Sequence, residues 1–265
     1  MNRLRIYSVF LKNLYLTRRS FPRIMGLFYW VTVELLFWGF ITLWLRGLVD
    51  DPTVDIAFML LTALIFWDLF TRAQQSFSVL FLEDIWARNV LNVFAAPIRP
   101  GEFVAGLALV SVAQGLIAFV YVAILAALLY ALQVWTLGVY VIPFFVNVMA
   151  FGWAIGLVVV GLLIRFGPSV EVLAWSVPFL FLPFSAVYYP VDVLPPVVQG
   201  IAFFSPPMHF FEGMRAIVQS GTLPWDHLLW GTALNAVAFG LGLAFFYGML
   251  RVARRRGLIA RLITE

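Results

Sequence analysis

Apolar stretches long enough to cross a membrane alternate along the chain with short polar segments. An α-helix rises about 1.5 Å per residue, so roughly 20 apolar residues cross the hydrocarbon core of a bilayer. We predict one span in each of six stretches: 24–45, 56–80, 103–132, 139–164, 172–189 and 228–250. The pattern therefore predicts an all-α membrane protein with six transmembrane helices, in which residues 1–265 form a single transmembrane domain.

Basic residues are sorted between the two sides of these spans. When the spans are counted in order, 14 of the 17 lysine and arginine residues fall on one side. Arg46, in the net acidic loop 46–55, and Arg215 fall on the other side, and Arg72 lies within a span. Positive residues concentrate on the cytoplasmic side of membrane proteins. We therefore expect both termini in the cytoplasm.

The chain begins with a segment of mixed apolar and basic residues, 1–23. A helix over residues 3–20 would gather apolar side chains on one face and polar ones on another, and we predict an amphipathic helix in the cytoplasmic membrane interface. The apolar face would hold Leu4, Tyr7, Leu11, Leu14 and Tyr15, and the polar face Arg5, Ser8, Lys12 and Arg19. The alternative is a disordered basic tail.

Two further segments are too polar or too broken to cross. Residues 82–102 carry three acids and two arginines, and we place them in the cytoplasm. Residues 190–226 hold six prolines between short apolar runs, which predicts short re-entrant helices in the outer leaflet. One of these helices should start after Ser205, with Pro206 in its first turn, and end before Gly221.

Composition narrows the class of protein. Hydrophobic residues make up 63% of the chain, mean hydropathy is +0.99, and charged residues are 11%, against roughly 25% in a soluble domain. The absence of cysteine excludes disulfides and cysteine-ligated metals. No glycine-rich nucleotide loop precedes Lys12, so we expect no enzyme activity and no catalytic, cofactor-binding or metal-binding residue. Because the basic residues flank spans, we expect them to meet membrane lipid and not nucleic acid.

Three ionisable residues lie within predicted spans, where unpaired charge is costly. Asp68 and Arg72 are four residues apart and can pair on one helix face. Their pair would either fix the second span against a neighbour or line and gate a translocation path. Glu34 has no local partner, so it should face a protein interface or a wet cavity, or be protonated.

Smaller signals concern packing and the two histidines. Gly152 and Gly156 form a GxxxG step in the fourth span, which permits close helix packing. His209 and His227 fall in the outer segment, where we expect loop residues and not metal ligands.

Two longer stretches carry a family resemblance. Residues 83–106, EDIWARNVLNVFAAPIRPGEFVAG, place acids before a short helix and a proline turn. Residues 183–218, PFSAVYYPVDVLPPVVQGIAFFSPPMHFFEGMRAIV, combine an aromatic–proline pair, a leucine–proline step and a Glu-x-x-Arg step. The chain resembles the membrane (permease) subunit of a type 2 ATP-binding-cassette (ABC) exporter, a family that includes bacterial drug, polysaccharide and nodulation-factor exporters.

The resemblance implies partners and site residues. Such a permease pairs with a second copy of itself or a paralogous permease and binds two copies of a cytoplasmic ABC ATPase, which hold ATP and Mg²⁺. Residues 83–94 would form the coupling helix, with Glu83, Asp84 and Arg88 as contacts to the ATPase. Within residues 195–220, Glu212 and Arg215 would form an outer gate.

The resemblance also implies a location and a cargo. The location would be the cytoplasmic (inner) membrane of a bacterium or archaeon. The expected activity is alternating-access export of an amphipathic, lipid-like or drug-like molecule, with neither the cargo nor the direction fixed by the sequence. A polysaccharide or glycolipid exporter is less favoured, because the N-terminal stretch PRIMGLFYWVTVELLFWG departs from the pattern of such members. From another class, an ATP-independent channel or scaffold remains the alternative.

Overall fold

The computed structural model describes residues 1–46, 56–132 and 134–258, and this part of the chain is helical without a strand. Most of the acidic loop 46–55 and the last residues of the basic C-terminal tail lie outside the described residues. The α-helices are α1 (Arg3–Arg19), α2 (Phe21–Arg46), α3 (Ile56–Trp86), α4 (Val90–Ala95), α5 (Pro100–Tyr130), α6 (Val141–Phe166), α7 (Leu173–Phe181), α8 (Pro196–Phe203), α9 (Pro206–Ser220) and α10 (Trp225–Arg255). The 3₁₀-helices are η1 (Val134–Tyr140), η2 (Gly167–Val170), η3 (Leu182–Phe184) and η4 (Val191–Val193).

Four helices in the described part of the chain are long and apolar enough to cross a membrane. They are α2, α5, α6 with its flanking 3₁₀ turns, and α10, and they correspond to the predicted first, third, fourth and sixth spans. The predicted all-α class is thus confirmed, together with helices of membrane-spanning length at these four places.

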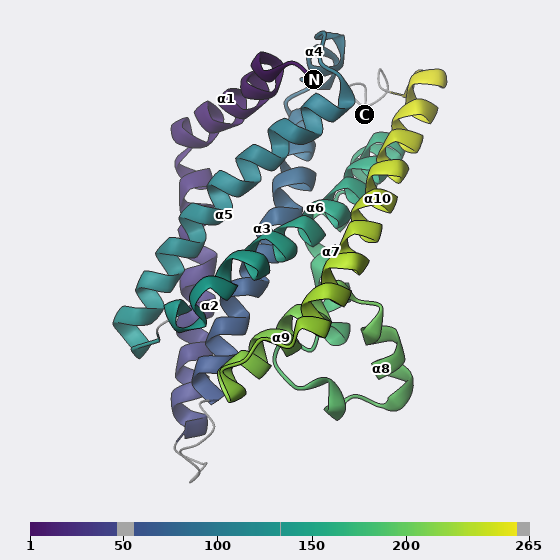
Figure 1. The fold of residues 1–265 in the computed structure, drawn as a ribbon. Coiled ribbons are helices and arrows are strands. Elements are labelled where there is room, and N and C mark those ends of the chain that lie inside the picture. Colours follow the sequence, from purple (N-terminus) through teal and green to yellow (C-terminus); the bar gives the residue numbers. More distant parts are fainter. Residues whose placement is uncertain (47–55, 133, 259–265) are drawn as a thin grey trace.

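The predicted second span lies in α3, the central helix of the bundle (Figure 1). Helix α3 packs against α2, α5, α6 and α7. Leu61, Leu64 and Phe77 on it are completely buried. Because neighbouring helices cover α3, its polar side chains need not face hydrocarbon. The helix also continues beyond the predicted span to Trp86, so it includes the first residues of the predicted cytoplasmic segment 82–102.

The predicted fifth span, 172–189, is shorter in the structure. Helix α7 ends at Phe181 and continues only as the 3₁₀ turn η3. The apolar helix Leu173–Phe184 is about 18 Å long at 1.5 Å per residue, less than the roughly 30 Å of a hydrocarbon core. Pro178 and Pro183 lack an N–H to donate, which explains why a regular helix does not continue here.

The GxxxG step brings α6 against α3. A Cβ atom added at Gly152 would lie 2.8 Å from the backbone oxygen of Phe70, and one at Gly156 would lie 2.9 Å from that of Gln74. Two helix backbones meet this closely only where a side chain is missing. The predicted close packing at Gly152 and Gly156 is confirmed, and α3 is the partner helix.

The N-terminal helix forms as predicted and packs on α5. Val9, Asn13 and Thr17 face the protein and are buried. Four residues of the predicted apolar face are exposed, namely Leu4, Tyr7, Leu14 and Tyr15. Helix α1 therefore presents an apolar face away from the bundle, as an interfacial helix requires.

The two ends of the bundle differ in what they contain. Figure 1 places the N-terminus, α4 and the last turn of α10 at one end, and α8 and α9 toward the other. Helix α9 has the predicted boundaries, with Ser205 before its first residue and Gly221 after its last in the left-handed conformation at φ 70°. The expected side-chain cap is not made. The Ser205 Oγ is instead buried without a hydrogen-bond partner among the described residues.

Candidate functional site

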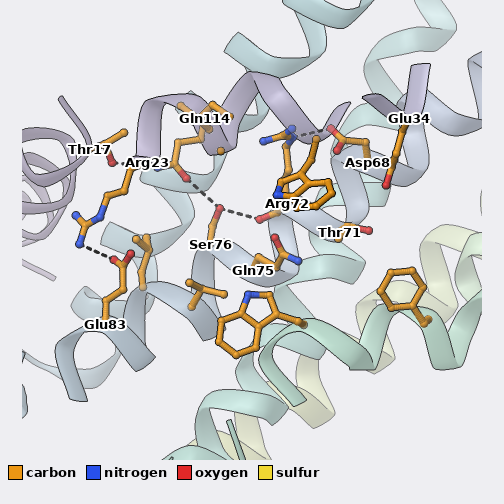
Figure 2. A pocket seen from close by; sticks show the side chains of 17 residues that line it. Thr17, Arg23, Glu34, Asp68, Thr71, Arg72, Gln75, Ser76, Glu83 and Gln114 are labelled. Carbon is orange, nitrogen blue, oxygen red and sulfur yellow. Dashed lines mark hydrogen bonds and ion pairs between the residues drawn. The ribbon is translucent and has the colours of Figure 1, made fainter. Parts of the chain in front are cut away.

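An open cavity of about 690 Å³ lies along the face formed by α2, α3 and α7 (Figure 2). Helices α1 and α5 contribute Thr17 and Gln114 to its wall. The cavity brings together all three ionisable residues that the sequence places inside spans, Glu34, Asp68 and Arg72. No sequence pattern predicted that they share one cavity, since Glu34 comes from α2 and the other two come from α3.

Asp68 and Arg72 form the predicted pair. The Nε of Arg72 donates to Oδ2 of Asp68 at 2.5 Å, and both side chains are mostly buried. Glu34 lies beside them (Figure 2) and makes no hydrogen bond or ion pair with any residue that the structure describes. Asp68 and Arg72 thus balance each other's charge within α3, and the carboxyl group of Glu34 has no cationic partner among the described residues.

A chain of hydrogen bonds crosses the cavity wall and joins three helices. The Oγ of Ser76 on α3 donates to the Arg72 carbonyl oxygen at 2.8 Å and lies 3.3 Å from Oε1 of Gln114 on α5. The Nε2 of Gln114 lies 3.3 Å from Oγ1 of Thr17 on α1. These side chains link α3, one turn after Arg72, through α5 to the N-terminal helix.

The other end of the cavity holds a second ion pair. Nη2 of Arg23, at the start of α2, lies 2.9 Å from Oε2 of Glu83 near the end of α3. Burial raises the pKa of the Glu83 carboxyl above its ordinary value, and the Arg23 guanidinium opposes that rise. Glu83, predicted as a contact to a partner, is thus engaged inside the chain.

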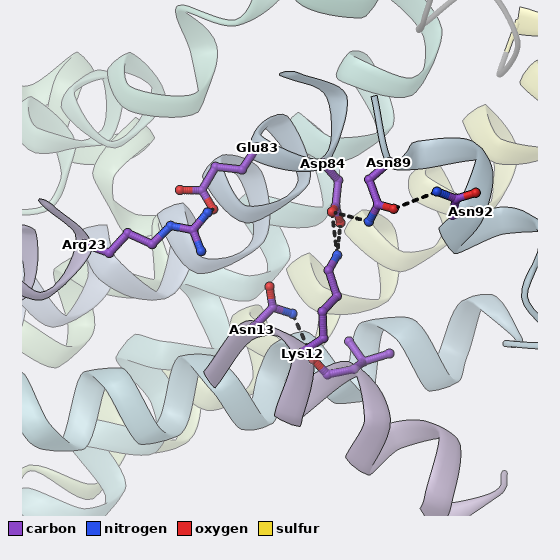
Figure 3. A network of polar contacts seen from close by, with 8 residues as sticks. Lys12, Asn13, Arg23, Glu83, Asp84, Asn89 and Asn92 are labelled. Atoms are coloured by element: carbon purple, nitrogen blue, oxygen red, sulfur yellow. Dashed lines mark hydrogen bonds and ion pairs between the residues drawn. The ribbon is translucent and has the colours of Figure 1, made fainter. Parts of the chain in front are cut away.

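Asp84 is also engaged inside the chain, with the only lysine of the sequence (Figure 3). Nζ of Lys12 on α1 lies 2.6 Å from Oδ2 of Asp84, and Nδ2 of Asn89 donates to Oδ1 at 3.1 Å. Asp84 is only 7% exposed. Its carboxylate therefore ties α1 to the end of α3 and to the turn before α4.

Arg88, the third predicted contact residue, lies in the turn between α3 and α4. Its side chain is exposed, and its backbone is left-handed at φ 53°. Asn92 on α4 is exposed as well. Of the predicted contact residues Glu83, Asp84 and Arg88, only Arg88 extends freely from the surface.

The predicted pair Glu212–Arg215 lies on α9. Nη1 of Arg215 donates to Oε1 of Glu212 at 2.5 Å, while its Nη2 donates to the carbonyl oxygens of Ala186 at 2.9 Å and Tyr189 at 3.1 Å. The same Glu212 oxygen accepts from the backbone N–H of Val191 at 2.7 Å. The pair thus fastens α9 to the irregular segment that follows α7.

The two histidines were expected in a loop, but the structure places both in helices. His209 on α9 and His227 in the first turn of α10 line a second cavity of about 320 Å³, and their Nδ1 atoms are 3.4 Å apart. Nε2 of His209 donates to the Phe203 carbonyl oxygen at 2.8 Å. Across the described residues, no group of three or more histidine, aspartate or glutamate side chains is arranged to hold a metal ion.

Sequence reasoning missed Lys12 and Arg23 as partners of the two acids at the end of α3. The only signal for Lys12 was its uniqueness among basic residues that are otherwise arginine. Ion pairs between helices distant in sequence have no fixed spacing, so no periodicity points to them. Comparison with protein-family models found no match to this chain, and comparison with curated proteins found none either.

Proposed function

We propose that this chain is the permease subunit of an ATP-driven exporter of the ABC type. The observation that carries the proposal is that α3 runs without a break from the cavity wall to the residues just before α4. This single helix of 31 residues carries the Asp68–Arg72 pair in the cavity wall and Glu83 and Asp84 at its end, just before α4. A continuous helix is a stiff element that carries displacement from one end to the other.

In this proposal α4 and the turn before it form the docking element for the ATPase. Arg88 and Asn92 are the exposed polar side chains available for that contact. Glu83 and Asp84 then have a different role from direct contact, because their ion pairs with Arg23 and Lys12 link the end of α3 to α2 and α1. Movement of α4 would pass through these pairs to the helices around the cavity.

The same proposal gives the chain six membrane crossings, cytoplasmic termini and a dimeric assembly with two ATPase subunits. Helix α7 covers only part of the fifth crossing, and the irregular segment that follows it would complete that crossing. The segment 190–226 would cover the path from the outer side without crossing. Its closure would depend on the Glu212–Arg215 pair, which holds α9 against the backbone of Ala186 and Tyr189. ATP binding and hydrolysis in the partner would alternate the side to which the cavity opens.

Lining residues support an amphipathic cargo. Charged and amide groups on α3 face the cavity together with the apolar side chains of Leu27, Trp30, Trp175 and Phe179. A site of this kind combines apolar contact area with a few polar groups, as small-molecule sites do.

Co-purification tests the proposal. The tagged chain is expressed with candidate ABC ATPases encoded next to it, purified in mild detergent and assayed for ATP hydrolysis. We expect an ATPase to co-purify and Arg88→Glu to release it. Arg254→Glu, the same charge reversal on an exposed residue near the end of α10, should leave the complex intact.

Reversal of Glu83 and Asp84 is a poor probe, because it would also break two internal ion pairs. If the chain purifies alone and no candidate supports ATP hydrolysis with it, the exporter proposal is wrong. The ATP-independent channel or scaffold would then be favoured.

A further inference from the structure

The cavity between α2, α3 and α7 holds one more acidic than basic side chain. Its lining holds three carboxylates, from Glu34, Asp68 and Glu83, and two guanidinium groups, from Arg23 and Arg72. Asp68 is paired with Arg72 and Glu83 with Arg23, which leaves the carboxyl group of Glu34 without a cationic partner among the described residues. When Glu34 is ionised, the lining carries a net charge of −1.

From this imbalance we propose that the cavity binds an organic monocation with an apolar body, and that Glu34 is its counter-ion. The inference rests on the proposed function, because it names the substrate class of the same site. An unpaired carboxylate inside an apolar span is costly, and a bound cation would offset that cost. Among the described residues, each arginine of the lining already has a carboxylate to balance its charge, so an anion would compete with Asp68 or Glu83, although Nη1 of Arg23 has no hydrogen-bond partner.

The cavity wall offers aromatic and apolar surface to the body of such a cation. The indole of Trp30 comes from the same helix as Glu34, one turn earlier, whereas Trp175 from α7 lines the other end of the cavity, where it stacks on Trp86. Indole faces attract organic cations through the negative electrostatic potential of the ring. Leu27, Val79, Leu80 and Phe179 supply apolar surface. The volume of about 690 Å³ lies within the usual range of roughly 300–1,000 Å³ for small-molecule sites.

Two probes of equal shape and opposite charge test this inference. Binding of radiolabelled tetraphenylphosphonium to the purified full-length chain is measured by equilibrium dialysis in detergent, without any ATPase. We expect saturable binding that excess unlabelled tetraphenylphosphonium displaces. Tetraphenylborate, the anion of the same shape, should not displace it.

Variants of Glu34 identify the counter-ion. Glu34→Gln should weaken tetraphenylphosphonium binding at least about tenfold, which corresponds to about 1.4 kcal/mol. Glu34→Asp, which keeps the charge, should retain most of the binding and serves as the control for folding. Asp192→Asn removes an exposed carboxylate outside the cavity and should change nothing.

Unchanged affinity in Glu34→Gln would overturn the inference, as would equal binding of tetraphenylborate. The readout does not depend on ATP, so it separates this inference from the proposed function. If the chain binds the cation through Glu34 but recruits no ATPase, the cation-site inference stands and the exporter proposal is wrong. If the chain recruits the ATPase but its affinity for tetraphenylphosphonium does not depend on Glu34, the exporter proposal stands and the cation-site inference is wrong.

Discussion

The side-chain nitrogen of Lys12 lies 2.6 Å from Oδ2 of Asp84, across 72 positions of sequence. This contact joins the N-terminal helix to the end of the central helix, immediately before α4. Arg5 on the same polar face lies 3.6 Å from the buried carboxylate of Glu102 at the start of α5. Helix α1 is therefore attached through its basic face to the two helices that flank α4, while its apolar face is turned outward.

Removal of the Lys12 ammonium should destabilise the protein. Lys12→Met would leave the Asp84 carboxylate buried with Asn89 as its remaining partner, and we expect a loss of about 1–3 kcal/mol in the free energy of unfolding. The midpoint of unfolding in detergent, followed by tryptophan fluorescence, measures this loss. Lys12→Arg keeps the charge and should lose less. An unchanged midpoint in Lys12→Met would show that the ion pair contributes nothing to stability.

A methyl group at Gly152 should be costly, although alanine normally favours helices. Gly152→Ala would force α6 away from the Phe70 carbonyl of α3, and we expect a destabilisation of about 1–3 kcal/mol. Gly240→Ala on α10 is the matched control, because a Cβ atom there meets no atom within 4 Å. That substitution should be neutral or stabilise by up to about 1 kcal/mol through helix propensity. Equal unfolding midpoints for the two variants would contradict the close approach of α6 to α3.

Acidification should loosen the outer segment through His209. Burial is the main reason that the pKa of His209 is lowered from its ordinary value of 6.5, and nearby His227 adds to the effect, while the hydrogen bond to Phe203 and the charge of Asp226 oppose it. The unfolded chain therefore takes up this proton more readily than the folded one. The stability that neutral His209 contributes is fully present above pH 6.5 and is lost as the pH falls from 6.5 toward the lowered pKa.

Unfolding midpoints measured between about pH 8 and about pH 5 test this sign. The midpoint should fall on acidification, and His209→Gln, which does not titrate, should make the dependence shallower. A midpoint that rises on acidification in the original chain but not in His209→Gln would contradict the direction of the pKa shift.

Single cysteines test the orientation of the proposed six-span arrangement, since the chain has none of its own. Val193→Cys places a thiol at a position that is 70% exposed, before α8, and Arg254→Cys places one near the end of α10. A membrane-impermeant maleimide applied to intact cells should label the first variant. It should label the second only after permeabilisation. The opposite pattern would reverse the orientation derived from the basic residues.

The hydropathy pattern predicted most helices, because burial in lipid or protein demands apolar residues at nearly every position of a span. It predicted α2, α5, α6 and α10 well. It overestimated the helix in 172–189, since an apolar run does not reveal how far Pro178 and Pro183 interrupt a helix. The hydropathy pattern also ended the second span at 80, whereas α3 continues to Trp86. The last turns of α3 are stabilised by packing against neighbouring helices and by the ion pairs of Glu83 and Asp84.

The candidate site was predictable only where its contacts are local. Asp68–Arg72 and Glu212–Arg215 are spaced four and three residues apart, which helical geometry converts into contact. The position of Glu34 beside the first pair depends on how α2 packs on α3, and hydropathy carries no information about that register. The same limit explains why Asp84 looked like a free contact residue before its partner Lys12 was known.

The central claim, that α4 and the turn before it dock an ABC ATPase, has a direct test in the cysteine-free chain. Arg88→Cys and, as control, Arg254→Cys are each labelled with a thiol-specific photocrosslinker in membranes that contain the co-expressed ATPase. We expect illumination to join the ATPase to the chain through position 88 and not through position 254. No adduct at position 88, or equal adducts at both positions, would contradict the claim.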